Sequence, residues 1–172
     1  MNVLLSILML FGGMVDRKET SVIVIHHSAG EYGNAESFRK DHMTNPEKMW
    51  EDIGYHFVIT NGNGGPDGKI QVGRDIWRQG AHAKHSHWGN MNPYSVGICL
   101  VGEDTFTEKQ KIATILLVAK LCLKYNIKPS PETIRNHHEE CPGPGLDIPE
   151  IIRETKRYFD YIKKVKALNN LQ

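Results

Sequence analysis

The amino-acid sequence predicts a single α/β domain in which a central mixed β-sheet is flanked by helices. Two observations support this fold class. Val22-Ile23-Val24-Ile25 is β-branched throughout, as expected for a strand buried on both faces. Short apolar runs elsewhere in the chain are joined by segments of helical period. A length of 172 residues and a charged fraction of 24% suit one globular domain with its own core.

The first half of the domain is expected to contain three strands and a helix. Ser21–His27 is the first strand, and it ends in a polar His-His-Ser sequence. A helix is expected from Asn34 to about Thr44, because asparagine is a favoured N-cap residue. Asn61–Gly68 has the composition of a turn. It is therefore interpreted as the long loop of a hairpin whose strands are Tyr55–Thr60 and Lys69–Gly73.

The clearest helix is expected at Thr107–Tyr125. Thr107 and Gln110 have the spacing of a capping box at its start. An apolar stripe at helical spacing is predicted to face the core, and it consists of Ile112, Ile115, Leu116, Ala119 and Leu123.

Four further segments complete the domain. Gln79–Asn92 has little periodicity and is interpreted as a surface loop, whereas Ser95–Val101 is an apolar strand. Thr133–His137 is compatible with a strand or a loop. Pro149 to about Leu168 is expected to be the last helix, because proline is favoured in a first helical turn.

Residues 1–15 are interpreted as an apolar N-terminal segment, separate from the domain formed by residues 16–172. Val3–Val15 is shorter than the roughly 20 residues that a helix needs to span a bilayer. Its length suits the apolar region of a signal peptide, although no Lys or Arg precedes it. A secretion signal or membrane tether and an apolar helix packed on the domain are equally weighted. Any membrane contact is expected only through this segment.

Charge and cysteine content exclude some classes of protein. A formal net charge of +1 gives no strong attraction to nucleic acid or anionic membranes, so no nucleic-acid partner is expected. The three cysteines are odd in number and contain no CxxC pair, which argues against a disulfide framework. The chain contains nine histidines, which gather in three places.

A zinc site is the first chemical hypothesis. Catalytic zinc takes three protein ligands and leaves a fourth position open. His26, His137 and Cys141 are suitable ligand types, and His137 and Cys141 are close in sequence. Two alternatives stay open on spacing alone. The histidines could be ordinary core and surface residues, or Cys141 could be a nucleophile paired with a histidine.

Six segments resemble the type 2 family of zinc-dependent N-acetylmuramoyl-L-alanine amidases, which includes amidase-type phage lysozymes. The pattern is also similar to the peptidoglycan recognition proteins of animals. The resemblance extends from about Val22 to Leu146. Its segments, which occur in the family's order and at about its spacing, are Val24–Ala29, Ile53–Ile59, Gly73–Asp75, Gly80–Lys84, Ser95–Gly102 and His137–Gly143.

The resemblance implies a fold, a reaction and a set of residues. The fold is that of the amidase and recognition-protein family, and the reaction is zinc-dependent hydrolysis of the amide bond between N-acetylmuramic acid and L-alanine in peptidoglycan or muropeptides. The implied zinc ligands are His26, His137 and Cys141. Tyr55 corresponds to a catalytic tyrosine, and His82 to a histidine that lines the substrate groove.

One departure from the family concerns the segment between His137 and Cys141. Most family members have a longer segment here, and the phage lysozyme carries a catalytic lysine in it. The shorter segment leaves open whether His138 replaces His137 as the ligand. It also leaves the second catalytic group to another residue, and the candidates by proximity in sequence are Glu139, Glu140 and Lys84.

Two classes of function compete with the amidase. The alternative is a catalytically inactive module that binds peptidoglycan, as in relatives that have lost the cysteine. A cysteine hydrolase that uses Cys141 is a third hypothesis. Trp88, Asn90 and Asn92 are candidate substrate-binding residues in the loop. The protein is expected to be a monomer in the cell envelope or secreted, or a phage or prophage lysin that acts on the cell wall.

Overall fold

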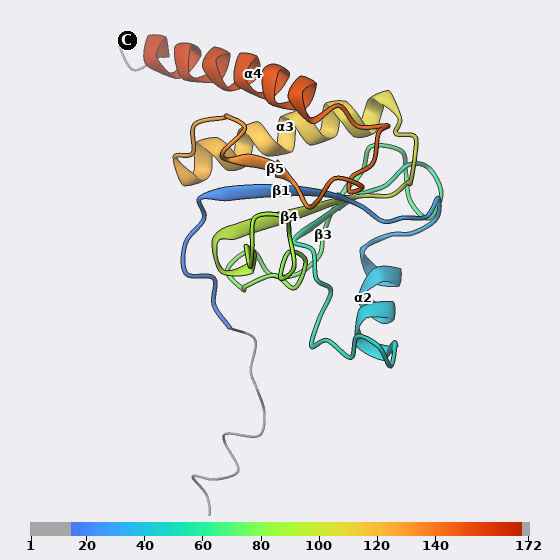
Figure 1. The fold of residues 1–172 in the computed structure, drawn as a ribbon. Coiled ribbons are helices and arrows are strands. Elements are labelled where there is room, and N and C mark those ends of the chain that lie inside the picture. The colour runs from blue at the N-terminus through green and yellow to red at the C-terminus, as the bar shows by residue number, and fades with distance from the viewer. Residues whose placement is uncertain (1–14, 170–172) are drawn as a thin grey trace, which may run out of the picture.

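The computed structural model describes residues 15–169, so nearly all of the apolar N-terminal segment lies outside the described residues. Within residues 15–169 the chain forms one five-stranded sheet and three α-helices (Figure 1). The elements in chain order are β1 (Val22–His27), α2 (Ala35–Thr44), β2 (Phe57–Ile59), β3 (Ile70–Val72), a short 3-10 helix (Asn92–Tyr94), β4 (Ser95–Leu100), α3 (Glu108–Tyr125), β5 (Ile134–Asn136) and α4 (Ile148–Asn169).

The sheet is mixed, as predicted, and its strand order is β3-β2-β4-β1-β5. Strands β2, β4, β1 and β5 run parallel, and only β3 is antiparallel to its neighbour. The segment Thr133–His137, which the sequence left as a strand or a loop, contains strand β5, because Ile25 of β1 pairs with Asn136. The carboxyl ends of β1, β4 and β5 therefore meet at one edge of the sheet.

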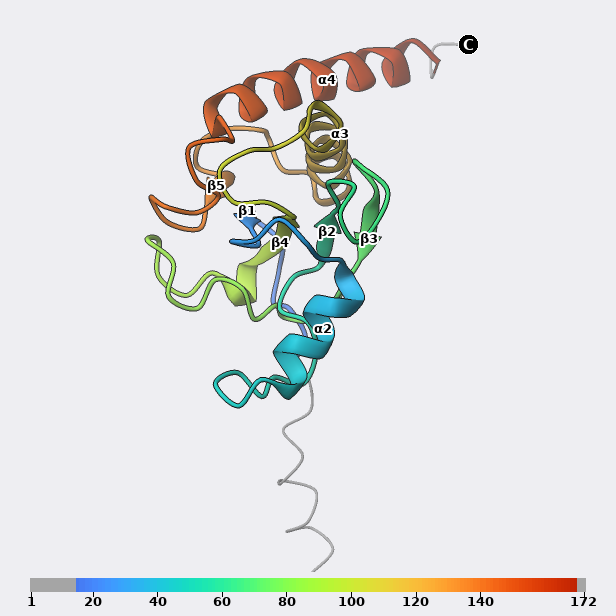
Figure 2. The ribbon, with the colours of Figure 1, turned by 90° about the vertical axis from the view of Figure 1, so that its right-hand side faces the viewer.

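The helices form layers on both faces of the sheet. Figures 1 and 2 show α3 between the sheet and α4, with α2 on the opposite side. The main core fills the space between the sheet and α3. Its strand residues are fully buried, and each stabilises the fold by about 1.5–3 kcal/mol; they include Ile23, Ile25, Val96, Ile98, Leu100 and Ile134.

The buried side of α3 differs from the predicted stripe. Ile112 and Leu116 are 54% and 40% exposed. Since α3 contacts both the sheet and α4, apolar residues surround most of the helix, and their period alone does not identify the core-facing side. The start of the helix is as predicted, because Thr107 and Gln110 form the capping box. The apolar residues of α3 that are buried are Ala113, Leu117, Val118, Ala119, Leu121 and Cys122.

The segment Gln79–Asn92 is irregular, as expected, but it is not confined to the surface. His82, Ala83 and Asn92 are all buried. The Asn92 side-chain oxygen accepts hydrogen bonds from the backbone N–H groups of His82 and Ala83, at 3.0 and 2.7 Å. These contacts satisfy polar groups that would be costly to bury alone. The segment therefore forms part of the interior on the face of the sheet opposite α3.

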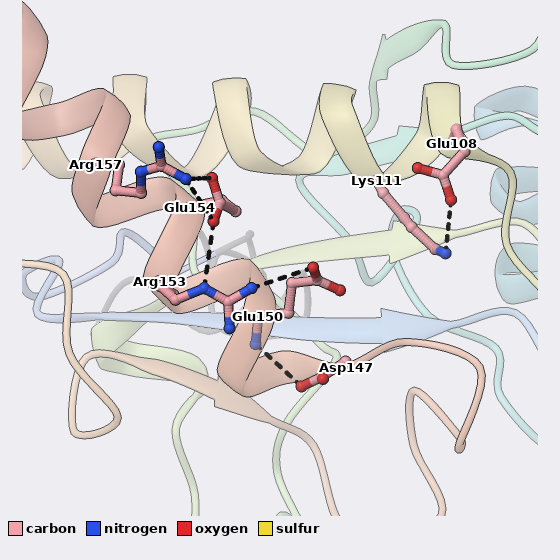
Figure 3. Close-up of polar contacts among 7 residues, drawn as sticks. All are labelled: Glu108, Lys111, Asp147, Glu150, Arg153, Glu154 and Arg157. Carbon is pink, nitrogen blue, oxygen red and sulfur yellow. Dashed lines mark hydrogen bonds and ion pairs between the residues drawn. The ribbon is translucent and has the colours of Figure 1, made fainter.

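Helix α4 is stabilised at its start and is polar on its outer side. The Asp147 carboxylate accepts a hydrogen bond from the Glu150 backbone N–H at 3.0 Å, which caps the first turn (Figure 3). Arg153 pairs with Glu150, and Arg157 with Glu154. Such exposed ion pairs stabilise a fold only slightly. Among the residues described, no helix is both long and apolar enough to cross a membrane.

Candidate active site

Two histidines from neighbouring strands converge at the sheet edge. His26 is near the carboxyl end of β1, and His137 directly follows β5. Because the two strands are parallel neighbours, their ends lie side by side. The ring centroids of His26 and His137 are 4.7 Å apart. The pairing of β1 with β5 thus brings one imidazole from each strand end to the same place.

A tight turn brings Cys141 to the same point. The His137 backbone N–H donates to the Cys141 carbonyl at 3.1 Å, and the Cys141 N–H donates to the His138 carbonyl at 3.1 Å. These paired bonds close the short segment into a compact turn. The short segment therefore returns Cys141 to the side of His137.

The ligand atoms of His26, His137 and Cys141 all lie within 4.8 Å of one another. The Cys141 sulfur is 3.9 Å from Nδ1 of His26. Zinc binds sulfur at about 2.3 Å and imidazole nitrogen at about 2.0 Å, which puts two tetrahedral ligands about 3.6 Å apart. The group therefore fits a metal ion with small adjustments. Nitrogen and sulfur donors of this kind do not suit an oxygen-preferring ion.

Burial keeps the two imidazoles neutral, which is the form that binds a metal. His26 is 1% exposed. Its pKa lies well below 6.5, first because of burial and then because of the neighbouring His137. Burial, followed by His138, lowers the pKa of His137 to about 4. Burial raises the pKa of Cys141 to about 11, so a bound cation is needed to hold its thiolate at neutral pH.

His27 and His138, the sequence neighbours of the two histidine ligands, lie outside the group of three potential ligands. The group of potential ligands contains His137 and not His138. Nδ1 of His27 is 3.2 Å from the Cys141 sulfur, so His27 contacts one ligand from the side. His27 and His138 both line the groove next to Cys141.

Tyr55 lies immediately beside the metal-ligand group. Its ring centroid is 5.2 Å from that of His26. Burial, and then the thiols of Cys99 and Cys141, raises the pKa of Tyr55 well above 10. The phenol is therefore protonated at neutral pH and is available as a hydrogen-bond donor.

His82 lies behind His26 rather than on an open surface. It is only 7% exposed. Its Nδ1 is 2.9 Å from Nε2 of His26. This placement differs from the expected one in a substrate groove, because the irregular segment that carries His82 is folded into the interior.

Two depressions adjoin the metal-ligand group. One, of about 720 Å³, is lined by Cys141, Glu139 and Glu103 among others. The other, of about 320 Å³, is lined by Tyr55 and Tyr32 among others. Cys141 borders the first depression, and Tyr55, whose ring centroid is 5.2 Å from that of His26, borders the second.

The remaining predicted residues occupy different settings. Glu139 is exposed and lies on the groove beside Cys141. Lys84 is exposed on the loop, and within residues 15–169 its ammonium group has no hydrogen bond or ion pair that would direct it towards the ligands. Trp88 is 46% exposed, and the guanidinium of Arg135 lies 4.3 Å from its ring centroid.

Asn90 and Asn92 shape the loop. The Asn90 side chain accepts a hydrogen bond from the Asn92 backbone N–H at 3.2 Å. Asn92 is only 5% exposed and supports His82 from behind. Asn92 was predicted to line the groove, whereas its side chain is buried and supports the backbone at His82 and Ala83. The sequence signal that could indicate this role is the position of Asn92 at the end of an irregular segment that contains histidines.

Two histidines and a cysteine that meet beside the strand ends, with a tyrosine next to them, have the residue types of a metal-dependent hydrolase. Residues 16–144 match the N-acetylmuramoyl-L-alanine amidase family, Amidase_2. The endolysin of Escherichia phage T7 is 32% identical over 142 residues, which cover 77% of this chain and 85% of that protein.

Solved structures agree with this assignment. The N-acetylmuramoyl-L-alanine amidase LysC from Clostridium intestinale URNW is 29% identical with a TM-score of 0.61, covering 78% of this chain and 84% of that one. Drosophila PGRP-LB is 27% identical with a TM-score of 0.59, covering 81% and 87%. The chain belongs to the N-acetylmuramoyl-L-alanine amidase family. It is an enzyme of that kind, a hydrolase of peptidoglycan.

Proposed function

We propose that the amidase is zinc-dependent and that His26, His137 and Cys141 hold the ion. The observation that carries the proposal is the approach of two imidazole nitrogens and one sulfur to within 4.8 Å of one another. Three protein ligands leave a fourth position for solvent or substrate, as in catalytic zinc sites. The bond cleaved joins the lactyl group of N-acetylmuramic acid to L-alanine of the stem peptide.

The protein side of the reaction needs a polarised amide and a route for protons. Zinc, when bound, supplies a Lewis acid that acidifies water and polarises a carbonyl group. Tyr55 donates a hydrogen bond from its phenol to the amide oxygen as negative charge develops there. Its raised pKa supports this role, because the donor keeps its proton.

We assign the second catalytic role to Glu139 rather than to Lys84. Glu139 lies on the groove that Cys141 also lines. Its carboxylate accepts a proton from the attacking water and returns it to the amine nitrogen that leaves. Among the described residues, Lys84 lines neither of the two depressions beside the ligand group.

The two depressions beside the ligand group are the proposed substrate path. Trp88 offers an exposed aromatic face close to this path, since the backbone of the neighbouring His87 donates to the His137 carbonyl at 3.1 Å. Asn90 acts indirectly, through the shape of the loop. We expect peptidoglycan or released muropeptides as the substrate and a monomer as the active form, because one chain carries every ligand. Residues 16–172 are the proposed catalytic domain.

The phage relatives support the role of a lysin that acts on the cell wall. A peptidoglycan-binding module without catalysis is the second candidate, favoured by the similarity to Drosophila PGRP-LB and peptidoglycan-recognition protein SC1a. The complete His–His–Cys group favours the enzyme over the binding module.

Three single substitutions test the ligand assignment. His26→Ala, His137→Ala and Cys141→Ala are each expected to lose bound zinc and muropeptide hydrolysis together. Cys122→Ala is the matched control, because Cys122 is a buried cysteine of α3 outside the ligand group. It should keep both properties. Full activity in Cys141→Ala would overturn the assignment, and loss of zinc in His138→Ala but not in His137→Ala would reassign one ligand.

A further inference from the structure

The buried histidine behind His26 is part of a chain of polar contacts. Nδ1 of His82 is 2.9 Å from Nε2 of His26. On its other side, Nε2 of His82 is 3.4 Å from the Ser95 hydroxyl. The Ser95 hydroxyl donates to the Met91 carbonyl at 2.8 Å. Both ring nitrogens of His82 thus have one neighbour each.

The proposed metal site fixes the direction of these bonds. Nδ1 of His26 faces the Cys141 sulfur at 3.9 Å, so this nitrogen offers its lone pair to the ion. A neutral imidazole has a single N–H, which must then be on Nε2 of His26. That N–H donates to Nδ1 of His82. His82 therefore carries its own proton on Nε2 and donates it to Ser95.

We propose that His82 is a positioning residue that holds His26 in the orientation and tautomer needed for the metal. The inference rests on the zinc site proposed above and gives His82 a role other than substrate binding. A metal-bound histidine commonly donates its second N–H to a fixed acceptor, and such acceptors tune metal affinity. Here the acceptor is itself oriented by the Ser95 hydroxyl and the Met91 carbonyl.

Contacts with Asn92 and Gly97 fix the position of the His82 ring. The Asn92 side chain accepts from the His82 backbone N–H at 3.0 Å and so fixes the main chain. The ring lies directly over Gly97 of β4, where a Cβ atom would come within 2.6 Å of it. Any larger residue at this position would collide with the ring. At 7% exposure, the ring has little surface left to contact a glycan strand.

Zinc affinity of the purified full chain, measured by competition with a chromogenic chelator, tests the proposal. His82→Leu should bind zinc roughly 10- to 100-fold more weakly than the wild type. His82→Asn should recover most of the affinity, because its side-chain oxygen can accept from His26 in place of Nδ1. His42→Leu is the matched control: His42 is 6% exposed, its Nδ1 accepts from Gly54 N–H, and its ring packs against Tyr55 and lies outside the group of three ligands. Its zinc affinity should stay within about threefold of the wild-type value.

A second measurement needs no variant. Long-range ¹H–¹⁵N spectra of the zinc-loaded protein should show His82 protonated on Nε2 and unprotonated on Nδ1. Protonation of His82 on Nδ1 would overturn the proposal, and so would wild-type zinc affinity in His82→Leu. A wild type that binds no zinc would instead refute the proposed metal site, and the positioning role with it.

Discussion

A methyl group added at Gly97 should destabilise the protein through the ring of His82. Gly97 lies in β4 and, within the described chain, its backbone is outside the left-handed region that favours glycine. An ideal Cβ at this position would lie 2.6, 2.6 and 2.7 Å from three His82 ring atoms. Favourable contacts between such atoms are at about 3.5–4.0 Å. Gly97→Ala must therefore displace the ring.

The expected loss is about 1–3 kcal/mol in the free energy of unfolding, which is typical of overpacking in a core. Urea unfolding of the zinc-free protein, followed by circular dichroism, measures it without a contribution from metal binding. Gly30→Ala is the control, because a Cβ at Gly30 would meet no atom within 4 Å. Its unfolding free energy should change by less than about 0.5 kcal/mol.

A double-mutant cycle separates the ring from other causes. In a His82→Ala background the Cβ at position 97 has no ring to displace, so Gly97→Ala should cost less than about 0.5 kcal/mol. An equal loss of unfolding free energy in both backgrounds would refute the proposed clash. So would a Gly97→Ala substitution that leaves the unfolding free energy of the otherwise wild-type protein unchanged.

Three further predictions follow from single residues. Tyr55→Phe should keep zinc and the fold, while turnover of muropeptides falls about 100- to 1,000-fold; an unchanged rate would exclude Tyr55 as the donor. Burial lowers the pKa of His56 to about 4, so its contribution to stability is complete above pH 6.5 and is lost as the pH falls towards 4. Urea midpoints of the zinc-free protein across this range should fall with acidity, and the fall should be shallower in His56→Gln. Gln110→Ala should cost about 2–4 kcal/mol in urea unfolding, because the Gln110 amide donates to the buried carbonyls of Ile59 and Val101; a neutral effect would contradict this.

Local chemistry made much of the fold predictable from the sequence. The β-branched run at β1 and the capping box at Thr107 are local signals, and both elements begin within one residue of the predicted position. The core-facing side of α3 was not predictable in the same way. It depends on where α4 packs against α3, and the sequence of α3 by itself does not determine that position.

The site shows the same division. The residue types of His26, His137 and Cys141 suggested a metal, and the structure brings their ligand atoms together. The role assigned to them remains a prediction. His82 was expected to line the substrate groove, whereas the structure buries it. The sequence does not indicate this burial, because it depends on contacts with Asn92 and Gly97, which are not neighbours of His82 in sequence.

The most direct test of the central claim is the metal content of the purified chain, paired with muropeptide hydrolysis before and after chelation. A zinc-dependent amidase should contain about one zinc ion per chain, release free stem peptide, lose that activity on chelation and regain it when zinc is added. Hydrolysis that persists in the fully chelated protein would contradict a zinc enzyme. A purified chain that takes up no added zinc, and that binds peptidoglycan without cleaving it, would contradict the amidase and support the recognition module.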